Sequence, residues 1–331
     1  MLNLEKIPRL RIAFLPTPLE EAVHLRRKIG GPRLFIKRDD QTGLALGGNK
    51  ARKLEFLMAD AQRREATVVL TAGAPQSNHA RMTAAACAKW GIKCYLLLGG
   101  LKELRRRQGN LLLDELLNAQ IEFTDEENNE QLLLMMKEKA REMKKRGEIP
   151  YIIPVGGSNP LGALGYVAAM RELLTQTKKL GLKVDYLVHA TSSGGTQAGL
   201  LLANKALKTD IKIMGISVSP DKKTAANRVV KIARGAAKLL NLDISITPKD
   251  VLVFDEYIGK GYAIPSREGS EAIRLLAQAE GIILDPVYTG KAMSGLIDLI
   301  KEKRFDSKET VVFFHTGGYP GLFAIPPYPA K

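Results

Sequence analysis

Short apolar runs rich in β-branched residues alternate with longer segments of helical periodicity along most of this chain. The runs predict strands over Arg33–Lys37, Thr67–Ala72, Ile92–Leu98, Ile121–Thr124, Tyr151–Pro154, Val184–Ala190, Ile211–Ser217, Ile282–Leu284 and Thr310–His315. Helices are predicted over Ala51–Arg64, His79–Lys89, Asn128–Arg146, Leu161–Thr177, Thr196–Leu207 and Gly269–Glu280. Several runs are apolar throughout, which is typical of strands covered on both faces. The alternation predicts an α/β fold with mainly parallel twisted sheets.

The length of the chain bears on its domain organisation. Its 331 residues exceed the roughly 250–300 residues at which one hydrophobic core stops growing, so two domains are expected. No Ser/Pro-rich linker separates them, so the chain should cross between them at the Gly-rich stretches before Lys50 and at 156–162. We predict two interwoven three-layer α/β domains, a larger one from 1–48 plus 163–331 and a smaller one from 49–162. The active site is expected in the cleft between them.

The formal net charge of +15 raises the possibility of a nucleic-acid partner. Such a protein would cluster its charge and interleave aromatic residues, whereas here only 102–107 and 137–146 are clustered, and both fit solvated helix faces or loops. A nucleic-acid binder is therefore disfavoured. The N-terminus lacks the apolar core of a signal peptide, and no apolar run approaches the ~20 residues of a membrane span. With two cysteines and no metal-binding pattern, we expect a cytoplasmic protein without a metal or a membrane partner.

The first candidate functional residue is Lys50, which follows Gly47-Gly48-Asn49 and precedes a predicted helix. A Gly-rich turn brings the backbone close to another group, and a lysine held there is a candidate Schiff-base former with a carbonyl cofactor or substrate. The alternative is a solvated lysine near a helix N-terminus, although a cation there opposes the helix dipole.

The loop Thr191–Thr196 is a second candidate, because it lies between a predicted buried strand and a predicted helix. Backbone N–H groups at a helix N-terminus, together with hydroxyls, favour an anion. The loop matches neither a Walker motif nor a Rossmann fingerprint. A simple N-cap turn is the alternative. Two glycines and several hydroxyls exceed what a cap needs, so a phosphate site is favoured.

Two further turns follow predicted strands, where the ligands of α/β sheets gather. Ser77, Asn78 and His79 offer a hydroxyl, an amide and an imidazole before a helix N-terminus that can hold a carboxylate. A capped helix start is the alternative there. Near the C-terminus, Tyr288 is either an acid or base in a tight turn or a packing residue with one hydrogen bond.

A candidate nucleophilic lysine, a phosphate site and a carboxylate-binding turn fit one cofactor best, pyridoxal 5′-phosphate (PLP), whose substrates are amino acids. Over nearly its whole length the chain also resembles the fold-type II (tryptophan synthase β-like) PLP enzymes. Within them it resembles the branch of 1-aminocyclopropane-1-carboxylate (ACC) deaminase and D-cysteine desulfhydrase. The motifs that carry the resemblance are Ile36–Asp40, Gly47–Lys50, Gln76–His79, Pro154–Ser158, Gly194–Thr196, Gly261–Tyr262, Leu284–Lys291 and His315–Gly318.

The resemblance implies which residues contact the cofactor. Lys50 would hold PLP covalently, and Asn78 would bond the oxygen on its ring. The phosphate would be held by Ser193, Gly194, Gly195 and Thr196. Thr289 and Thr316 are the candidates for the ring nitrogen, and which of the two reaches it stays open.

The resemblance also implies which residues contact the substrate. Ser77 and His79 would meet its carboxylate beside Asn78, and Tyr262 and Tyr288 would flank it. Lys50 is the expected base for the α-proton, with the two tyrosines as alternative proton carriers. Relatives in this branch are homodimers, so a homodimer is expected.

Thr289 and Thr316 favour one activity within the branch. ACC deaminases carry Glu after the tyrosine of the Asp-Pro-Val-Tyr motif and Leu after the C-terminal His, whereas D-cysteine desulfhydrases carry this threonine pair. A Glu at the pyridine nitrogen would keep it protonated, which suits opening a cyclopropane, while a hydroxyl suffices when thiolate leaves. The sequence thus favours a PLP-dependent lyase that converts D-cysteine or a close analogue to pyruvate, ammonia and hydrogen sulfide. The alternatives are ACC deaminase giving 2-oxobutanoate and ammonia, L-cysteate sulfo-lyase, and a PLP carrier without turnover.

Overall fold

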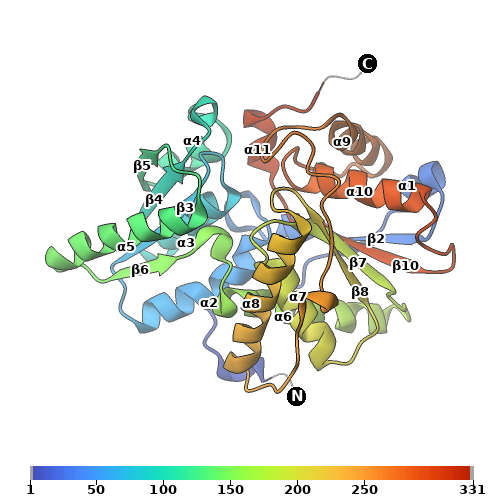
Figure 1. Cartoon of the computed structure of the whole chain (residues 1–331), viewed down its shortest axis with the longest axis horizontal. Helices are drawn as coiled ribbons and strands as arrows, with labels where there is room; N and C mark the ends of the chain where they lie inside the picture. The colour runs from blue at the N-terminus through green and yellow to red at the C-terminus, as the bar shows by residue number, and fades with distance from the viewer. Residues whose placement is uncertain (1–2, 329–331) are drawn as a thin grey trace.

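The computed structural model describes residues 3–328, and within them the chain forms two β-sheets with helices on both faces of each (Figure 1). The larger sheet has the strand order β1-β2-β10-β7-β8-β9. Its strands are β1 (Leu19–Glu21), β2 (Arg33–Lys37), β7 (Tyr186–Thr191), β8 (Lys212–Ser217), β9 (Leu252–Phe254) and β10 (Thr310–Phe314). Only β1 is antiparallel to its neighbour, β2. Because β2 pairs with β10, the two ends of the chain share one sheet.

The smaller sheet is wholly parallel and has the order β5-β4-β3-β6. Its strands are β3 (Val68–Gly73), β4 (Lys93–Gly99), β5 (Gln120–Thr124) and β6 (Pro150–Ile153). All four lie within 49–162, and all strands of the larger sheet lie outside that range. The domain boundaries themselves stay a prediction.

Helices connect most of the strands. The α-helices are α1 (Val23–Ile29), α2 (Lys50–Arg63), α3 (Asn78–Trp90), α4 (Gly109–Leu116), α5 (Asn129–Lys145), α6 (Pro160–Lys179), α7 (Gly195–Ala206), α8 (Lys222–Leu239), α9 (Arg267–Glu280), α10 (Thr289–Lys301) and α11 (Tyr319–Ala324). Short 3₁₀ helices cover Leu4–Lys6, Asp39–Gln41, Leu44–Leu46, Lys102–Leu104, Val155–Gly157 and Pro248–Asp250. Within residues 3–328, no helix is both long enough and apolar enough to span a membrane.

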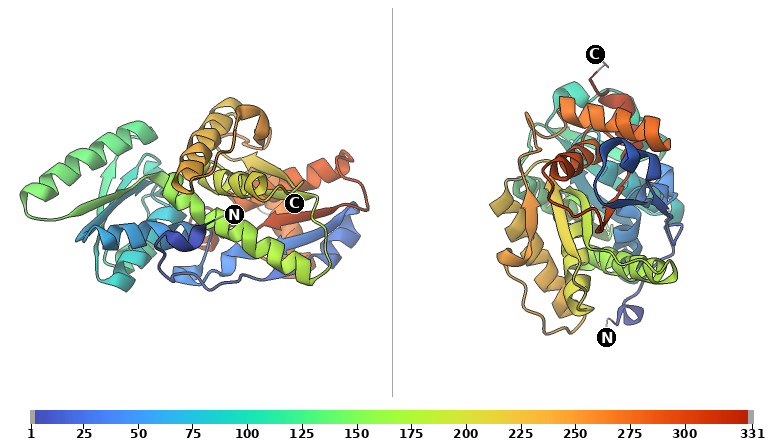
Figure 2. Two further views of the ribbon diagram at one scale, coloured as in Figure 1. Left: turned by 90° about the horizontal axis from the view of Figure 1, so that it is seen from below. Right: turned by 90° about the vertical axis from the view of Figure 1, so that its right-hand side faces the viewer.

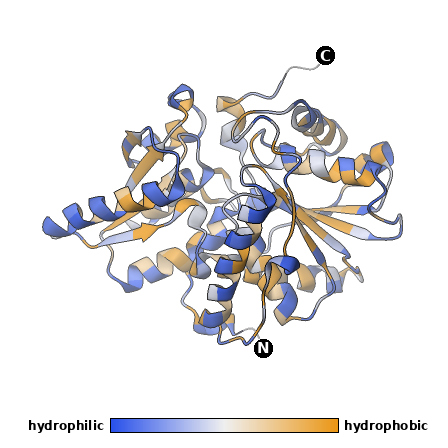
Figure 3. Cartoon of the chain, in the orientation of Figure 1, coloured by the Kyte–Doolittle hydropathy of each residue, from blue (hydrophilic) through white to orange (hydrophobic). Residues whose placement is uncertain are grey.

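Alternate residues of β10 enter two different cores, as the period of a strand requires. Val311 and Phe313 pack with α1, α9 and α10, whereas Val312 and Phe314 pack with α6, α7 and α8. Figure 2 shows these helices on opposite sides of the larger sheet. In the smaller sheet, α5 covers one face and α2 and α3 cover the other. Hydrophobic residues accordingly gather on the strands, while the outer end of α5 is hydrophilic (Figure 3).

The predicted α/β architecture is confirmed, but one predicted strand is wrong and several elements are missed. The predicted strand Ile282–Leu284 is wrong: both of its end residues are buried in the core beneath α9 and α10, yet the segment forms no strand. An apolar run can therefore pack into the core without pairing with a neighbouring strand. The sequence analysis also misses α8, although Ala225, Val229, Ile232 and Ala236 are buried at helical spacing. It misses the three-residue strands β1 and β9 as well, which are too short for a periodic signal.

Candidate active site

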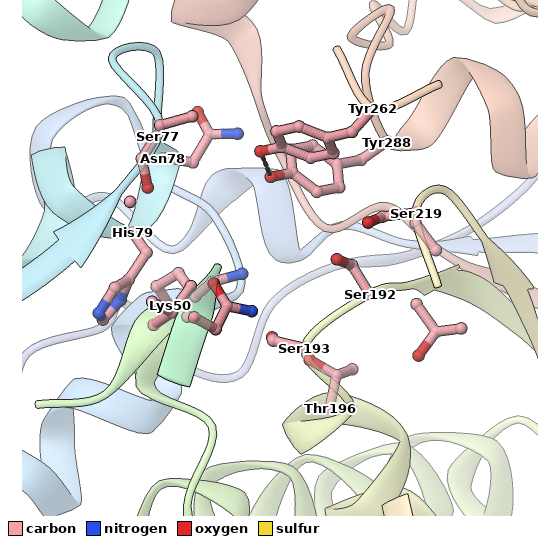
Figure 4. A pocket seen from close by; sticks show the side chains of 18 of the residues that line it. Lys50, Ser77, Asn78, His79, Ser192, Ser193, Thr196, Ser219, Tyr262 and Tyr288 are labelled. Carbon is pink, nitrogen blue, oxygen red and sulfur yellow. Dashed lines mark hydrogen bonds between the residues drawn. The ribbon is translucent and has the colours of Figure 1, made fainter. Parts of the chain in front are cut away.

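A cavity of about 330 Å³ lies where loops from both sheets meet (Figure 4). The loops after β3, β4 and β6 line it from one side, and those after β7, β8 and β10 line it from the other. Ligands of α/β sheets bind at these carboxyl ends of strands. Of the predicted site residues, the cavity brings together Lys50, Ser77, Asn78, His79, Ser193, Gly194, Thr196, Tyr262, Tyr288 and Thr316. Gly195 and Thr289 are buried outside its wall.

Lys50 reaches the cavity from a turn with a rare backbone conformation. The φ angles of Ala45, Leu46, Gly47 and Gly48 are 39°, 69°, 70° and 128°. A Cβ on Gly47 would lie 1.9 Å from the carbonyl oxygen of Asp40, so only glycine fits at this position. The close approach expected from the glycines is therefore real, and it brings the turn against the chain's own backbone.

The amine of Lys50 lies next to the predicted phosphate loop. Its Nζ donates to Oδ1 of Asn49 at 3.0 Å, and Nδ2 of Asn49 donates to Oγ1 of Thr196 at 3.2 Å. Burial lowers the pKa of Lys50 to about 8, with the cation of Arg81 acting in the same direction and Asp285 against it. An amine with this pKa supplies more of the unprotonated nucleophile near neutral pH than an ordinary lysine does.

The loop 192–195 leads into α7 through Gly194, which has φ 84° and occupies the N-cap position. The N-cap glycine has no side chain to cap the helix, so the N-cap alternative fails. N–H of Gly195 donates to Oγ of Ser158 at 3.3 Å, and the N–H groups that follow it in the first turn of α7 keep their capacity to bind an anion. Ser193 shares a hydrogen bond of 2.7 Å with Ser158. A Cβ on Gly195 would lie 2.6 Å from Oγ of Ser158 and 2.9 Å from Nζ of Lys53. The glycine is thus required by close packing behind the loop.

Lys53 lies behind the phosphate loop, outside the cavity wall, and the sequence analysis does not single it out. Its side chain is buried, and its Nζ donates to the carbonyl oxygen of Gly156 at 3.1 Å and to Oγ of Ser158 at 3.0 Å. Burial, followed by the charge of Lys50, lowers its pKa well below the usual value. Its hydrogen-bond partners are neutral, so a nearby phosphate would supply the missing anion. The sequence signal is its i,i+3 spacing from Lys50, which places both on one helix face.

The N-terminus of α3 presents Ser77 and Asn78 to the cavity (Figure 4). Ser77 is the N-cap, because its Oγ accepts from N–H of Ala80 at 3.2 Å, so the capping alternative also holds. Oδ1 of Asn78 accepts from Nδ2 of Asn110 at 3.0 Å. That contact fixes the amide of Asn78 and leaves its NH₂ group toward the cavity.

His79 is held as a neutral imidazole. Its Nε2 lies 2.9 Å from Oγ1 of Thr71, which donates to the carbonyl oxygen of Ile153 at 2.8 Å, so Nε2 carries the proton. Nδ1 is buried without a hydrogen-bond partner within the described part of the chain. Burial, then Lys50 and Lys53, lowers the pKa of His79 well below its usual value. His79 therefore brings no positive charge to the site.

Tyr262 and Tyr288 meet on the opposite side of the cavity (Figure 4). Their hydroxyls share a short hydrogen bond, and the rings meet edge to face with centroids 5.9 Å apart. Burial raises the pKa of both phenols, so both are protonated near neutral pH. Nζ of Lys291 donates to the carbonyl oxygens of Ile258 at 2.7 Å and Gly261 at 2.8 Å, and so holds the loop that carries Tyr262.

The structure separates the two threonines. Oγ1 of Thr289 donates to Oδ1 of Asp285 at 2.7 Å and accepts from N–H of Asp285 at 2.8 Å, so its hydroxyl is used within the turn. Thr316 lines the cavity, and its hydroxyl makes no hydrogen bond to another described residue. Of the two threonines, only Thr316 is placed to offer its hydroxyl to a ligand.

Further residues line the cavity. Ser192 adds a hydroxyl within the predicted phosphate loop, and Ser219, which the sequence analysis does not single out, adds another beside it (Figure 4). Glu127 and Asn129 belong to the wall near the N-terminus of α5, and Glu127 is the one carboxylate among the described residues that line the cavity. Glu127 lies beside Gly100, where a Cβ would come within 2.4 Å of its Cγ.

These residues fit PLP. The amine of Lys50 suits its aldehyde, and the uncapped N-terminus of α7 with Lys53 and the hydroxyls suits its phosphate. The NH₂ of Asn78 suits the ring oxygen, and the hydroxyl of Thr316 suits the ring nitrogen. Within residues 3–328, no three His, Cys, Asp or Glu side chains are arranged to hold a metal ion.

Comparisons with known proteins agree with this fit. The family model described as "Pyridoxal-phosphate dependent enzyme" matches residues 10–317. A solved structure described as "Crystal Structure Analysis of the ACC deaminase homologue" superposes with a TM-score of 0.89 at 39% sequence identity. The match covers 97% of this chain and 94% of that one, so the likeness extends over both sheets.

Proposed function

We propose, from the premise that this chain belongs to the pyridoxal-phosphate dependent enzyme family, that it is a lyase that eliminates hydrogen sulfide from D-cysteine or a close analogue. The other products would be pyruvate and ammonia. The observation that carries the proposal is the hydroxyl of Thr316, which lines the cavity without a partner while Thr289 is engaged by Asp285. A neutral hydroxyl at the ring nitrogen suits loss of a good leaving group such as thiolate.

The cofactor would be held by residues from both sides of the cavity. Lys50 would bond its carbonyl carbon, and Lys53 with the N-terminus of α7 would hold its phosphate. When bound, PLP supplies an electron sink for the negative charge that develops at the substrate α-carbon. Asn78, fixed by Asn110, would donate to the ring oxygen and set the tilt of the ring.

The substrate carboxylate would lie at the N-terminus of α3. Ser77 and the first N–H groups of the helix are donors there, and the helix dipole favours the negative charge. His79 would contribute as a neutral neighbour, because its protonated nitrogen already faces Thr71. This division makes Ser77 the expected determinant of KM for the amino acid.

The proton transfers would use the amine of Lys50 and the tyrosine pair. An amine with a pKa of about 8 can accept the α-proton near neutral pH. One phenol of the pair donates to the other, so a single hydroxyl proton stays available for the departing sulfur. Tyr288 or Tyr262 would thus act as the acid.

Turnover on a substrate panel tests the proposal. Purified enzyme would be assayed on D-cysteine, L-cysteine, L-cysteate, β-chloro-D-alanine, D-serine and ACC, with sulfide, keto acid and ammonia measured separately. We expect sulfide and pyruvate in equal amounts from D-cysteine and little keto acid from ACC. Keto acid from ACC without sulfide from D-cysteine would contradict the proposal, and no turnover on any substrate would favour a PLP carrier.

ACC deaminase is the second candidate, supported by the similarity to the structure described as an ACC deaminase homologue. The same panel separates it, because its keto acid is 2-oxobutanoate. L-cysteate is less favoured, since Glu127 lines the cavity and would repel a sulfonate.

We also propose a homodimer in the cytoplasm. Large side chains that stay exposed in the single chain, including Phe14 at 72% and Phe323 at 75%, support an interface with a second copy. Both cysteines are free and buried, which suits a reducing compartment. Sedimentation equilibrium would give twice the mass of the chain, and a monomer at all concentrations would contradict the dimer.

A further inference from the structure

Arg81 is a buried cation of α3 whose donors reach the turn before Lys50. Its side chain is 0% exposed. One guanidinium nitrogen, Nη1, donates to the carbonyl oxygens of Ala45 and Gly47, the latter at 3.1 Å. Nε donates to Oδ1 of Asn110 at 3.1 Å. The other terminal nitrogen, Nη2, reaches Oδ1 of Asn78 at 3.5 Å. These partners are all neutral, and Asp114, the anion that acts on the charge of Arg81, makes no hydrogen bond to it.

The turn that Arg81 contacts needs such support. Ala45 has φ 39° and ψ 64°, and Leu46 has φ 69°. Left-handed backbone costs free energy for residues with a Cβ, and it persists only where the surroundings enforce it. The two carbonyls that accept from Arg81 flank Leu46 on either side. By donating to both carbonyls, the guanidinium stabilises the left-handed backbone of this segment.

Arg81 also acts on a second group of the site. Asn110, whose Oδ1 accepts from Arg81, uses its Nδ2 to donate to Oδ1 of Asn78. Rotation of the Asn110 amide would break both contacts and present the wrong atom to Asn78. Nδ2 of Asn110 also donates to the carbonyl oxygen of Gln76 at 2.9 Å, so Arg81 and Gln76 together orient the Asn110 amide. Arg81 therefore contacts the turn before Lys50 and helps to set the orientation of Asn78.

We infer that Arg81 is a positioning residue, which holds the turn 45–48 and, through Asn110, the amide of Asn78 in the geometry that cofactor capture requires. The inference rests on the proposed roles of Lys50 and Asn78. An apolar side chain of the same volume could not replace Arg81. Only the planar guanidinium can donate to the two turn carbonyls and to Oδ1 of Asn110 at the same time.

The charge of Arg81 gives this role a separate signature. After burial, Arg81 is the next cause that lowers the pKa of Lys50, and Asp285 opposes it. Lys53 on α2 and His79 on α3 also face Lys50. Loss of the Arg81 cation should therefore raise the pKa of Lys50, while loss of the fork alone should not.

The test compares Arg81→Met, Arg81→Lys and a control, Thr83→Val. Thr83 is buried on the same helix and donates only to the carbonyl oxygen of His79. Apoprotein of each variant would be mixed with PLP over a range of pH, and covalent capture would be followed by visible absorption. Borohydride reduction and peptide mapping would locate the attachment, and thermal unfolding of the apoprotein would report folding.

We expect Arg81→Met to slow capture by at least roughly tenfold, because small misplacements of reacting groups are costly, and to move the pH midpoint of capture upward. Arg81→Lys keeps a charge but loses the fork, so it should slow capture while the pH midpoint stays. Thr83→Val should change neither quantity. The change in melting temperature of Thr83→Val shows how much a substitution inside α3 destabilises the apoprotein when Arg81 is intact.

A folded Arg81→Met variant with unchanged capture rate and pH midpoint would overturn the inference. If that variant does not fold, Arg81→Lys decides, and wild-type capture by it would overturn the inference equally. Attachment of PLP to a lysine other than Lys50 in the wild type would instead refute the proposed function. The two failures are therefore distinguishable.

Discussion

Lys50 and Lys53 show how surroundings divide the roles of two identical side chains on one helix face. Lys50 lines the cavity, whereas Lys53 is buried behind the phosphate loop against neutral partners. We expect Lys50→Ala to abolish covalent attachment of PLP, and Lys53→Ala to keep the attachment but weaken affinity for the phosphate. Borohydride trapping and titration with inorganic phosphate would measure the two effects. Trapping of PLP in Lys50→Ala would reverse the assignment.

The pKa of Lys50 predicts a pH dependence. Because burial lowers it from 10.5 to about 8, the unprotonated amine is formed as pH rises through about 8. Only that form attacks an aldehyde, so the rate of capture of PLP by the wild-type apoprotein should increase through the same range. Stopped-flow absorption would measure it. A midpoint near 10.5 would mean that the site does not perturb this amine.

The two threonines should respond differently to the same substitution. Thr316→Val removes the cavity hydroxyl, so it should shift the absorption of bound PLP and lower kcat with little change in stability. Thr289→Val leaves N–H of Asp285 without an acceptor and should cost about 1–3 kcal/mol of unfolding free energy. Spectra and urea unfolding would separate them. A spectral shift only in Thr289→Val would make that residue the partner of the ring nitrogen.

At the scale of elements, the N-terminus of α7 depends on two glycines for different reasons. Gly195 is confined by Ser158 and Lys53, whereas a Cβ on Gly194 would meet no atom closer than 3.4 Å but would have to adopt φ 84°. Gly195→Ala should therefore displace the loop and lower PLP affinity by at least roughly tenfold, or ~1.4 kcal/mol. Gly194→Ala should mainly cost stability, about 1–2 kcal/mol. Equal PLP affinity in both variants would refute the phosphate role of this loop.

At the scale of the molecule, a buried group of charges joins β2, α2 and α6. Arg52 pairs with Asp39 at 2.7 Å and with Glu172 at 2.9 Å, and Lys37 pairs with Glu172 at 2.5 Å. Two cations and two anions therefore balance in the interior. Arg52 lies two residues after Lys50, so this group anchors the helix on which the site depends.

Removal of the Glu172 carboxylate from this group of charges should lower the free energy of unfolding. Burial alone would raise the pKa of Glu172, but Arg52 and Lys37 outweigh it and bring the pKa to about 2 from 4.5. A lowered carboxyl pKa gives stability that is present above pH 4.5 and lost as pH falls toward 2, here about 3 kcal/mol. Glu172→Gln should lose a comparable amount at pH 7 and show a flatter acid dependence.

Urea unfolding from pH 7 down to pH 2 would measure this effect. Glu5→Gln is the matched control, because Glu5 pairs with Arg171 at the surface and such pairs contribute little. Equal unfolding free energies for the two variants at pH 7 would show that the buried charges do not hold α2.

Local patterns account for what could be predicted at the site. The Gly-rich turn, the hydroxyl loop and Ser77 before α3 are each contiguous in sequence, so their chemistry is visible without a fold. Lys53 was missed because a lysine on a helix is ordinary until its burial is known. The run Ile282–Leu284 was misassigned because apolar composition reports burial and not pairing.

The sequence by itself determined the alternation of strands and helices, the mainly parallel character of the sheets and the order of the motifs, because hydrophobic period and glycine conformation are local properties. Only the tertiary structure decided which groups meet. It assigned Thr289 to Asp285 and Thr316 to the cavity, and it placed Arg81 against the carbonyls of a turn more than thirty residues earlier. The contacts of Arg81 and the position of Thr316 depend on distances and burial created when distant segments pack, and no spacing along the chain encodes them. The contact of Thr289 with Asp285 lies within one turn, but a turn signal in the sequence does not say which hydroxyl it will use.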